Sequence, residues 1–428
     1  MLRSVNDLSS EVLPITTVGP ENSEVFGNPA SYLDTKTNKC GSTAASRRRR
    51  VRWERLFYLW EFSSLKRVRG CRRWSRTASG EVNVRMSKQG DQIAAGYEGL
   101  AKCGSGWACP LCSASIESAR REEIRQIVEG AAAEGLGVAF LTMTLRHMAS
   151  DSLDDLLTAA GKMYRSVTQS RAVRNRLKAL HSQGYIRVLE ITHGQNGWHP
   201  HFHLVLLFDW DQVLADRALE RVGAPWEDER FDSELQGLAD AMHATWAKRA
   251  AKEGLGEPLR DFFDIRTVEA GDLSKYLTKQ TLIPNEKEIA GVGYEMAGRG
   301  LKDGRKDSRT PWQIFDDFTE TGDLDDLDLW HAYEAATHGK RSIVFSRGLK
   351  DRYVISERSD QEVVDEEVGS IEDRVFTIID WSTVASQPGL PARILNVLER
   401  SGVDAAMAEC VGYGVPVRRP DEKPSSVS

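Results

Sequence analysis

Apolar positions along the chain follow two periods, and the elements that they predict alternate between helices and strands. Residues 113–134 and 152–180 place apolar side chains every three to four positions and predict helices, the second interrupted near 166–170. Residues 136–145 form an apolar run typical of a buried strand. Further strands are predicted at 185–193, 201–208 and 262–268, and further helices at 211–221, at 233–253 and from Gly271 onward. This mixture predicts an α+β fold with a central antiparallel sheet.

The two central strands form a hairpin whose register decides which side chains meet. If Thr192 pairs with His199, Glu190 lies opposite His201, and His203 lies on the same face of the sheet. A slip of one residue would move the carboxylate to the other face. His199 itself is expected at the turn rather than among the ligands of an ion.

His201, His203 and Glu190 together are a competent site for a divalent cation. Alternate residues of a strand point to the same face, so both imidazoles converge on one ion. Imidazole with carboxylate suits Mn and Zn, and with added water it holds Mg.

Charge is distributed unevenly along the 428 residues, although the net charge is only -6. Twelve Lys and Arg and two Glu lie between Arg47 and Arg76, whereas residues 316–328 hold seven acids and no base. Trp53, Trp60 and Trp74 are interleaved with the basic block, an arrangement that phosphate contact with base stacking uses. A solvated basic helix face is the alternative. The predicted DNA-binding residues are Arg47, Arg48, Arg49, Arg50, Arg52, Arg72 and Arg73.

Four of the six cysteines are spaced as a structural zinc site. Cys109 and Cys112 form a CxxC knuckle, and Cys103 and Cys71 complete a tetrahedral set. No apolar segment is long enough to cross a membrane, and the first residues do not form a signal peptide, so a cytoplasmic location is expected, where disulfides are rare.

A tyrosine on the last predicted helix is a candidate nucleophile. Asp272, Tyr276 and Lys279 share one helix face. A phenol with a pKa of ~10 needs help to attack a phosphodiester, which a divalent cation and the charge of Lys279 provide. Asp272 is a candidate to activate a water or hydroxyl later.

These motifs resemble those of plasmid rolling-circle replication initiators, the Rep proteins of the HUH endonuclease superfamily. The order of Phe140-Leu141-Thr142-Met143-Thr144, the two histidines and Tyr276-Leu277-Thr278-Lys279 is similar to the three family motifs. The cysteine stretch, together with residues 96–100 and 345–349, is similar to Rep proteins of actinobacterial plasmids.

The resemblance implies an HUH-like antiparallel sheet flanked by helices, an N-terminal zinc module and a mainly helical C-terminal region. It implies that Tyr276 nicks one strand at the plasmid origin by transesterification, forming a 5′-phosphotyrosyl bond and a 3′-OH primer, with Asp272 or Glu269 acting in termination. The implied cofactors are Mg or Mn at the nicking site and structural Zn. The implied partners are single-stranded or supercoiled origin DNA, a host helicase and a DNA polymerase, with no membrane. The expected divisions are a disordered leader 1–46, a zinc-like module 47–115, a nicking domain 116–283, an acidic helical region 284–417 and a disordered tail 418–428.

Three alternatives share part of this pattern. A mobilisation relaxase or single-strand transposase uses the same histidines and tyrosine. A His/His/Glu zinc hydrolase would not need Tyr276. A zinc-stabilised regulator would bind DNA without cutting it.

Overall fold

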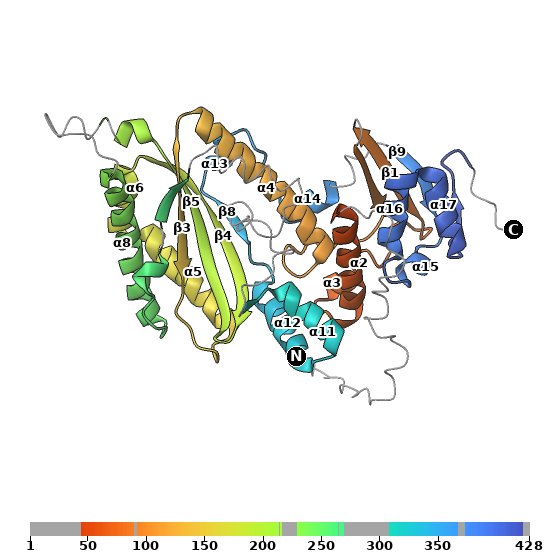
Figure 1. Cartoon of the computed structure of the whole chain (residues 1–428), viewed down its shortest axis with the longest axis horizontal. Coiled ribbons are helices and arrows are strands. Elements are labelled where there is room, and N and C mark those ends of the chain that lie inside the picture. Colours follow the sequence, from red (N-terminus) through yellow and green to blue (C-terminus); the bar gives the residue numbers. More distant parts are fainter. Residues whose placement is uncertain are drawn as a thin grey trace, which may run out of the picture.

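The core of the molecule is a six-stranded antiparallel sheet, which lies at the left of Figure 1. The computed structural model describes residues 44–89, 92–213, 215, 229–263, 265–268, 308–366 and 373–422. The strand order is β6-β3-β5-β4-β7, and β8 pairs with another part of β4. The strands are β3 (Gly137–Thr144), β4 (Ser182–Gly194), β5 (Gly197–Phe208), β6 (Ile265–Val268), β7 (Ser308–Arg309) and β8 (Ile343–Phe345).

The hairpin of β4 and β5 has the predicted register. Thr192 pairs with His199, and Glu190 with His201. Strand β5 begins at Gly197, earlier than expected, so His199 lies within the strand rather than at the turn. Gly197 has a φ of +80°, and a side chain there would also lie 2.9 Å from the backbone of Ala149, so the turn needs glycine.

Helices cover both faces of this sheet. On one face, α4 (Pro110–Ala133) packs Ile124, Ile127 and Val128 against apolar residues of β3, β4 and β5. On the other face lie α5 (Leu153–Gln169), α6 (Arg171–Ala179) and α8 (Glu229–Lys252). Ser170 ends α5 and caps α6, where its side chain accepts a hydrogen bond from the backbone N–H of Val173. The predicted interruption between the two helices is confirmed.

A second, four-stranded sheet joins the two ends of the described chain. Its order is β10-β9-β1-β2, and β1 (Val82–Gln89) pairs antiparallel with both β2 (Gln92–Glu98) and β9 (Asp373–Ile378). Strand β10 (Val417–Arg418) pairs with β9. The helices α15 (Trp381–Ala385), α16 (Leu390–Ser401) and α17 (Val403–Gly412) lie beside this sheet at the right of Figure 1.

Between the two sheets lie the basic and acidic segments that the charge pattern distinguished. The basic segment forms α2 (Ala44–Phe62) and α3 (Lys66–Arg69), and the acidic segment forms α11 (Pro311–Thr321) and α12 (Leu324–Thr337). Arg55 of α2 donates two hydrogen bonds, of 2.8 and 2.6 Å, to the carboxylate of Asp316. The shorter elements are η3 (Arg260–Phe262), α13 (Leu349–Arg352) and α14 (Asp360–Glu366).

The α+β class is confirmed by this mixture of helices and antiparallel strands. The predicted helix at 211–221 and the helix from Gly271 lie largely or wholly outside the described residues. The region after residue 307 is helical over much of its length, but it also contributes β7 and β8 to one sheet and β9 and β10 to the other. Among the described helices, none is both long and apolar enough to span a membrane.

Candidate metal centres

Glu190, His201 and His203 meet on the face of the large sheet that α4 also covers. Their ligand atoms lie within 4.8 Å of one another. Oε2 of Glu190 is 3.2 Å from Nε2 of His201 and 3.1 Å from Nε2 of His203. His203 and Glu190 are buried and His201 is partly buried, so few solvent molecules compete for these atoms.

The second nitrogen of each imidazole faces an oxygen. Nδ1 of His203 lies 3.3 Å from the hydroxyl oxygen of Thr142, and Nδ1 of His201 lies 3.4 Å from the carbonyl oxygen of His199. In the tautomer with protons on both Nδ1 atoms, these oxygens accept hydrogen bonds and both Nε2 lone pairs face a carboxylate oxygen of Glu190. Two Nε2 atoms and one carboxylate oxygen then converge as a donor set that fits a divalent metal ion.

Neighbours on β3 fix the orientation of His203. The ring of Phe140 stacks on its imidazole with 5.1 Å between centroids and 21° between planes. Thr142 pairs directly with His203 across the two strands. Residues 140–144 were recognised as a motif in the sequence, but no role was predicted for them. The alternation of side chains along β3 was the signal that could have placed Phe140 and Thr142 on the same face as the histidines.

His199 belongs to a separate pair beside this centre. Its Nδ1 lies 2.9 Å from Nε2 of His147. Burial, together with the charges of His201 and His147, lowers the pKa of His199 to about 4. The imidazole of His199 is therefore neutral near neutral pH. The contact with His147 was not predicted from the sequence, because His147 lies in the loop after β3.

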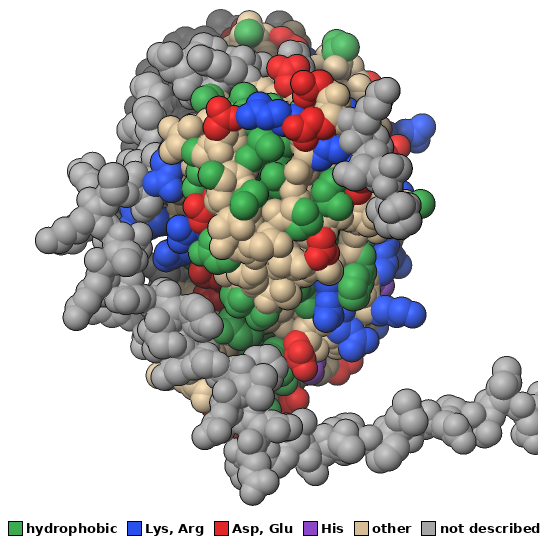
Figure 2. Space-filling model, turned by 90° about the vertical axis from the view of Figure 1, so that its right-hand side faces the viewer, with side chains coloured by type: hydrophobic (Ala, Val, Ile, Leu, Met, Phe, Trp, Pro, Cys, Tyr) green, Lys and Arg blue, Asp and Glu red, His purple; other side chains and the backbone are tan. Residues whose placement is uncertain are grey.

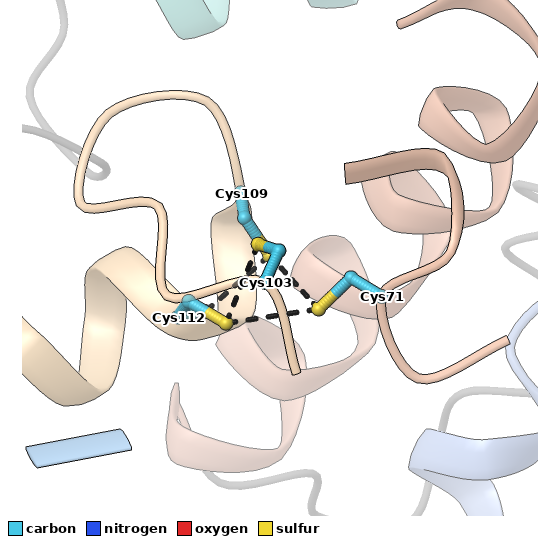
Figure 3. A group of neighbouring side chains, drawn as sticks. All are labelled: Cys71, Cys103, Cys109 and Cys112. Carbon is cyan, nitrogen blue, oxygen red and sulfur yellow. Dashed lines mark hydrogen bonds between the residues drawn. The ribbon is translucent and has the colours of Figure 1, made fainter. Parts of the chain in front are cut away.

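The four predicted cysteines form a second buried cluster (Figure 3). Cys71 follows α3, Cys103 lies in the loop before α4, and Cys109 and Cys112 lie at the start of α4. The Sγ atoms of Cys71 and Cys112 are 3.6 Å apart, and those of Cys103 and Cys112 are 3.7 Å apart. A tetrahedral zinc ion with Zn–S bonds of 2.3 Å separates its sulfur ligands by about 3.8 Å. The cluster therefore has the size of a zinc site.

The electrostatics at this cluster favour a thiolate at Cys112, whereas burial and the neighbouring thiols raise the pKa values of Cys103 and Cys109. Hydrogen bonds from the thiols of Cys103 and Cys109 hold the pKa of Cys112 well below its usual value. Cys112 also lies in the first turn of α4, where the positive end of the helix dipole stabilises a negative charge. Cys410 is buried in α17 outside the cluster, and Cys40 lies outside the described residues.

Several predicted DNA-binding arginines are held by contacts within the molecule. Arg49 donates to Glu399, at 2.5 and 2.8 Å, and to Asn396. Arg72 is buried, and its carbonyl oxygen accepts a hydrogen bond from Trp381. Arg50 is near Glu54, and burial lowers the pKa of Arg52. Arg49 therefore attaches α2 to α16, and the backbone of Arg72 attaches the loop after α3 to α15.

A smaller set of basic side chains in the same block is exposed. Arg73 is partly exposed and lies over the ring of Trp74, with 5.0 Å to its centroid, and Trp74 is 56% exposed. In contrast, Trp53 and Trp60 are buried. The exposed basic residues of the block are Arg47, Lys66, Arg67, Arg69 and Arg76. Figure 2 looks onto the end of the molecule that carries α15 to α17, where acidic, basic and apolar side chains are mixed.

The candidate nucleophile belongs to a segment outside the described part of the chain. Tyr276, Lys279, Asp272 and Glu269 all lie outside the described residues. The last described strand before them is β6, which ends at Val268 at the edge of the sheet next to β3.

Comparison with known proteins identifies relatives of the central part of the chain. Residues 101–212 match the family model described as replication protein. A "Protein rep" of Streptomyces lividans is 29% identical over 309 residues, which cover 60% of this chain and 66% of that protein, just under two thirds of its length. A "Protein rep" of Bacillus amyloliquefaciens is 31% identical over 103 residues, 23% of this chain and 28% of that protein.

A further relative has a different printed name. The "Neomycin resistance protein" of Streptomyces cyanogenus is 29% identical over 188 residues, 36% of this chain and 39% of that protein. No solved structure matches the chain. The predicted resemblance to Rep proteins is confirmed by these matches: residues 101–212, which include Cys103, Cys109, Cys112, His201 and His203, match the replication protein family model, and the chain is similar to the Rep proteins of Streptomyces and Bacillus.

Proposed function

We propose that this chain initiates rolling-circle replication of a plasmid by nicking one DNA strand at the origin. The observation that carries the proposal is the convergence of Glu190, His201 and His203 on one face of an antiparallel sheet, within a replication protein domain. The resemblance to HUH endonucleases implies a pair of histidines that a sheet presents to a divalent ion, and Glu190 adds a carboxylate to that pair here. Mn or Mg is the proposed ion, and it supplies positive charge that polarises a phosphodiester.

Tyr276 is the proposed nucleophile. Its phenol gives up its proton to water as the oxygen bonds to phosphorus, the bond from phosphorus to the 3′ oxygen breaks, and that oxygen takes up a proton from water to become the 3′-OH primer. Lys279 stabilises the negative charge that develops, and Asp272 or Glu269 serves the later closing step. The supporting observation is that β6 lies in the same sheet as the metal ligands and ends eight residues before Tyr276.

The proposed DNA surface is the exposed part of the basic block. Arg73 and Trp74 combine a charge for phosphate with a flat ring for a base. The exposed residues Arg47, Lys66 and Arg69 extend the charge. Arg49 and Arg72 support this surface from within, because both are held by other parts of the chain.

Zinc is the proposed ion of the four-cysteine cluster, where it has a structural role. All four thiols are buried, so the cluster has no open position for a substrate.

The proposed partners are origin DNA, either single-stranded or supercoiled, a host helicase, and a host polymerase that extends the 3′-OH end.

The proposal is tested by looking for a covalent protein–DNA adduct. The purified chain and a Tyr276→Phe variant are incubated with Mn or Mg and single-stranded DNA from the origin of the plasmid that encodes the chain. We expect an adduct with the unmodified chain and none with the variant. Cleavage that survives in the variant would indicate a metal-dependent hydrolase instead.

Other results distinguish the remaining functions. Binding without cleavage by either protein would indicate a regulator. An adduct that forms on a transfer origin but not on the replication origin would indicate a relaxase.

A further inference from the structure

We propose that Arg266 binds a backbone phosphate of the single DNA strand that enters the Glu190/His201/His203 centre. The inference rests on the proposed function and adds a substrate-binding residue to the same site. It comes from the position of Arg266 on β6, from the ring that supports it and from the lack of an acidic partner for it among the described residues.

Arg266 lies on the metal-binding face of the sheet. It pairs directly with Phe140 of β3, and His203 pairs with Thr142 of the same strand. Phe140 and Thr142 are alternate residues, so their side chains and those of Arg266 and His203 point to one face. The guanidinium of Arg266 lies 5.6 Å from the centroid of the Phe140 ring, which itself stacks on His203.

This support leaves the hydrogen-bonding edge of the guanidinium available. A guanidinium over an aromatic face is held by the ring, while its N–H groups point outward in the plane and match two oxygens of a phosphate. Strands β5 and β6 are separated by two strand spacings, about 10 Å. Arg266 is therefore placed for a phosphate neighbouring the one at the metal centre, rather than for the scissile one.

The charge of Arg266 is not neutralised within the described part of the chain. Its side chain is exposed, and its only described side-chain contact is the one with Phe140. Arg260, which precedes it by six residues, forms an ion pair of 2.7 Å with Asp240, and Arg309 pairs with Asp317 and Asp326. An exposed cation without a carboxylate, beside ligands for a phosphate-polarising ion, is complementary to a DNA backbone.

The test measures how binding to single-stranded DNA depends on salt. Full-length Tyr276→Phe protein, and the same protein with Arg266→Gln or Arg266→Lys, is titrated with a fluorescent single-stranded oligonucleotide of mixed sequence at several salt concentrations. Arg165→Gln is the matched control, because Arg165 is an exposed arginine on α5, which covers the opposite face of the sheet. Mn binding and thermal unfolding of each protein are measured in parallel.

We expect Arg266→Gln to weaken binding about tenfold and to reduce the slope of log K against log salt by ~0.7, the value for one phosphate contact on a single strand. Arg266→Lys should keep the slope but lose part of the affinity, because an ammonium cannot hold two oxygens in one plane. Affinity for Mn, the unfolding temperature and the Arg165→Gln control should be unchanged.

An unchanged slope in Arg266→Gln would overturn the proposal. A loss of Mn affinity with normal DNA binding would also overturn it, and would show that Arg266 acts on His203 through Phe140. These results are independent of the adduct assay. If the unmodified chain forms no adduct but Arg266→Gln changes the salt slope, only the nicking function is refuted. If the unmodified chain forms the adduct but Arg266→Gln leaves the slope unchanged, only the role of Arg266 is refuted.

Discussion

At the scale of single residues, the orientation of two imidazole rings decides the chemistry of the centre. When Thr142 and the carbonyl of His199 accept the Nδ1 protons of His203 and His201, both Nε2 lone pairs face Glu190. A buried carboxylate beside two neutral imidazoles is costly to desolvate. A divalent cation bound by the three side chains would offset this cost.

Replacing Glu190 tests this ligand set. Glu190→Gln keeps the size of the side chain but removes the charge that the ion needs, so we expect the affinity for Mn to fall by ~100-fold or more. Isothermal titration with Mn measures it, with Glu122→Gln on α4 as the control, because Glu122 is exposed and pairs with Arg125. Equal Mn affinity in Glu190→Gln and the unmodified chain would remove Glu190 from the site.

At the scale of elements, α4 connects the two candidate metal centres. Its first turn carries Cys109 and Cys112, and its second half packs Ile124, Ile127 and Val128 on the sheet that presents the histidines. A helix is stiff because of its backbone hydrogen bonds, so its two ends keep a fixed distance and orientation. The cysteine cluster is thus held in a fixed place relative to the histidine centre.

Helix α2 is attached to α11 by opposite charges, and this attachment can be measured. Arg55 is bidentate to Asp316, is largely buried, and lies over Trp312 at 5.3 Å. We expect Arg55→Ala to lower the free energy of unfolding by about 1–3 kcal/mol, since it removes charge-assisted hydrogen bonds and a packed side chain. Denaturant titration of Arg55→Ala, Asp316→Ala and the double variant gives the coupling energy, which we expect to be at least ~1 kcal/mol. A coupling near zero would mean that the pair contributes nothing to the attachment.

At the scale of the whole molecule, the cysteine cluster lies between the two sheets. Trp381, at the start of α15 in the C-terminal part of the chain, donates a hydrogen bond to the carbonyl of Arg72, the residue after Cys71. Trp60 of α2 donates to the carbonyl of Cys71 itself. Segments far apart in sequence therefore depend on the loop that the cluster anchors.

Removing one thiol should release the ion and loosen this region. We expect Cys109→Ser to lose the zinc proposed for this cluster, measured by elemental analysis, and to unfold at a lower temperature, because the binding free energy of a structural zinc contributes to folding. Cys410→Ser is the control, since Cys410 is buried but lies outside the cluster, and it should retain its zinc. Full zinc content in Cys109→Ser would show that the cluster is not the zinc site.

The features that depend on local periodicity and short spacing could be predicted from the amino-acid sequence alone. Alternation along β5 placed His201 and His203 on one face, and the short turn fixed the register that brings Glu190 to them, because a hairpin leaves few alternative pairings. The CxxC spacing identified two thiols of the cluster for the same local reason.

The distant groups that share these sites became evident from the three-dimensional fold. Arg72 and Arg49 look like phosphate ligands in the sequence, but the fold buries one and pairs the other with Glu399, more than 300 residues away. Arg266 has no local signal at all, and it reaches the metal face only because β6 pairs with β3. Burial and the charge of a partner depend on contacts between distant segments, and the local pattern of a chain does not contain them.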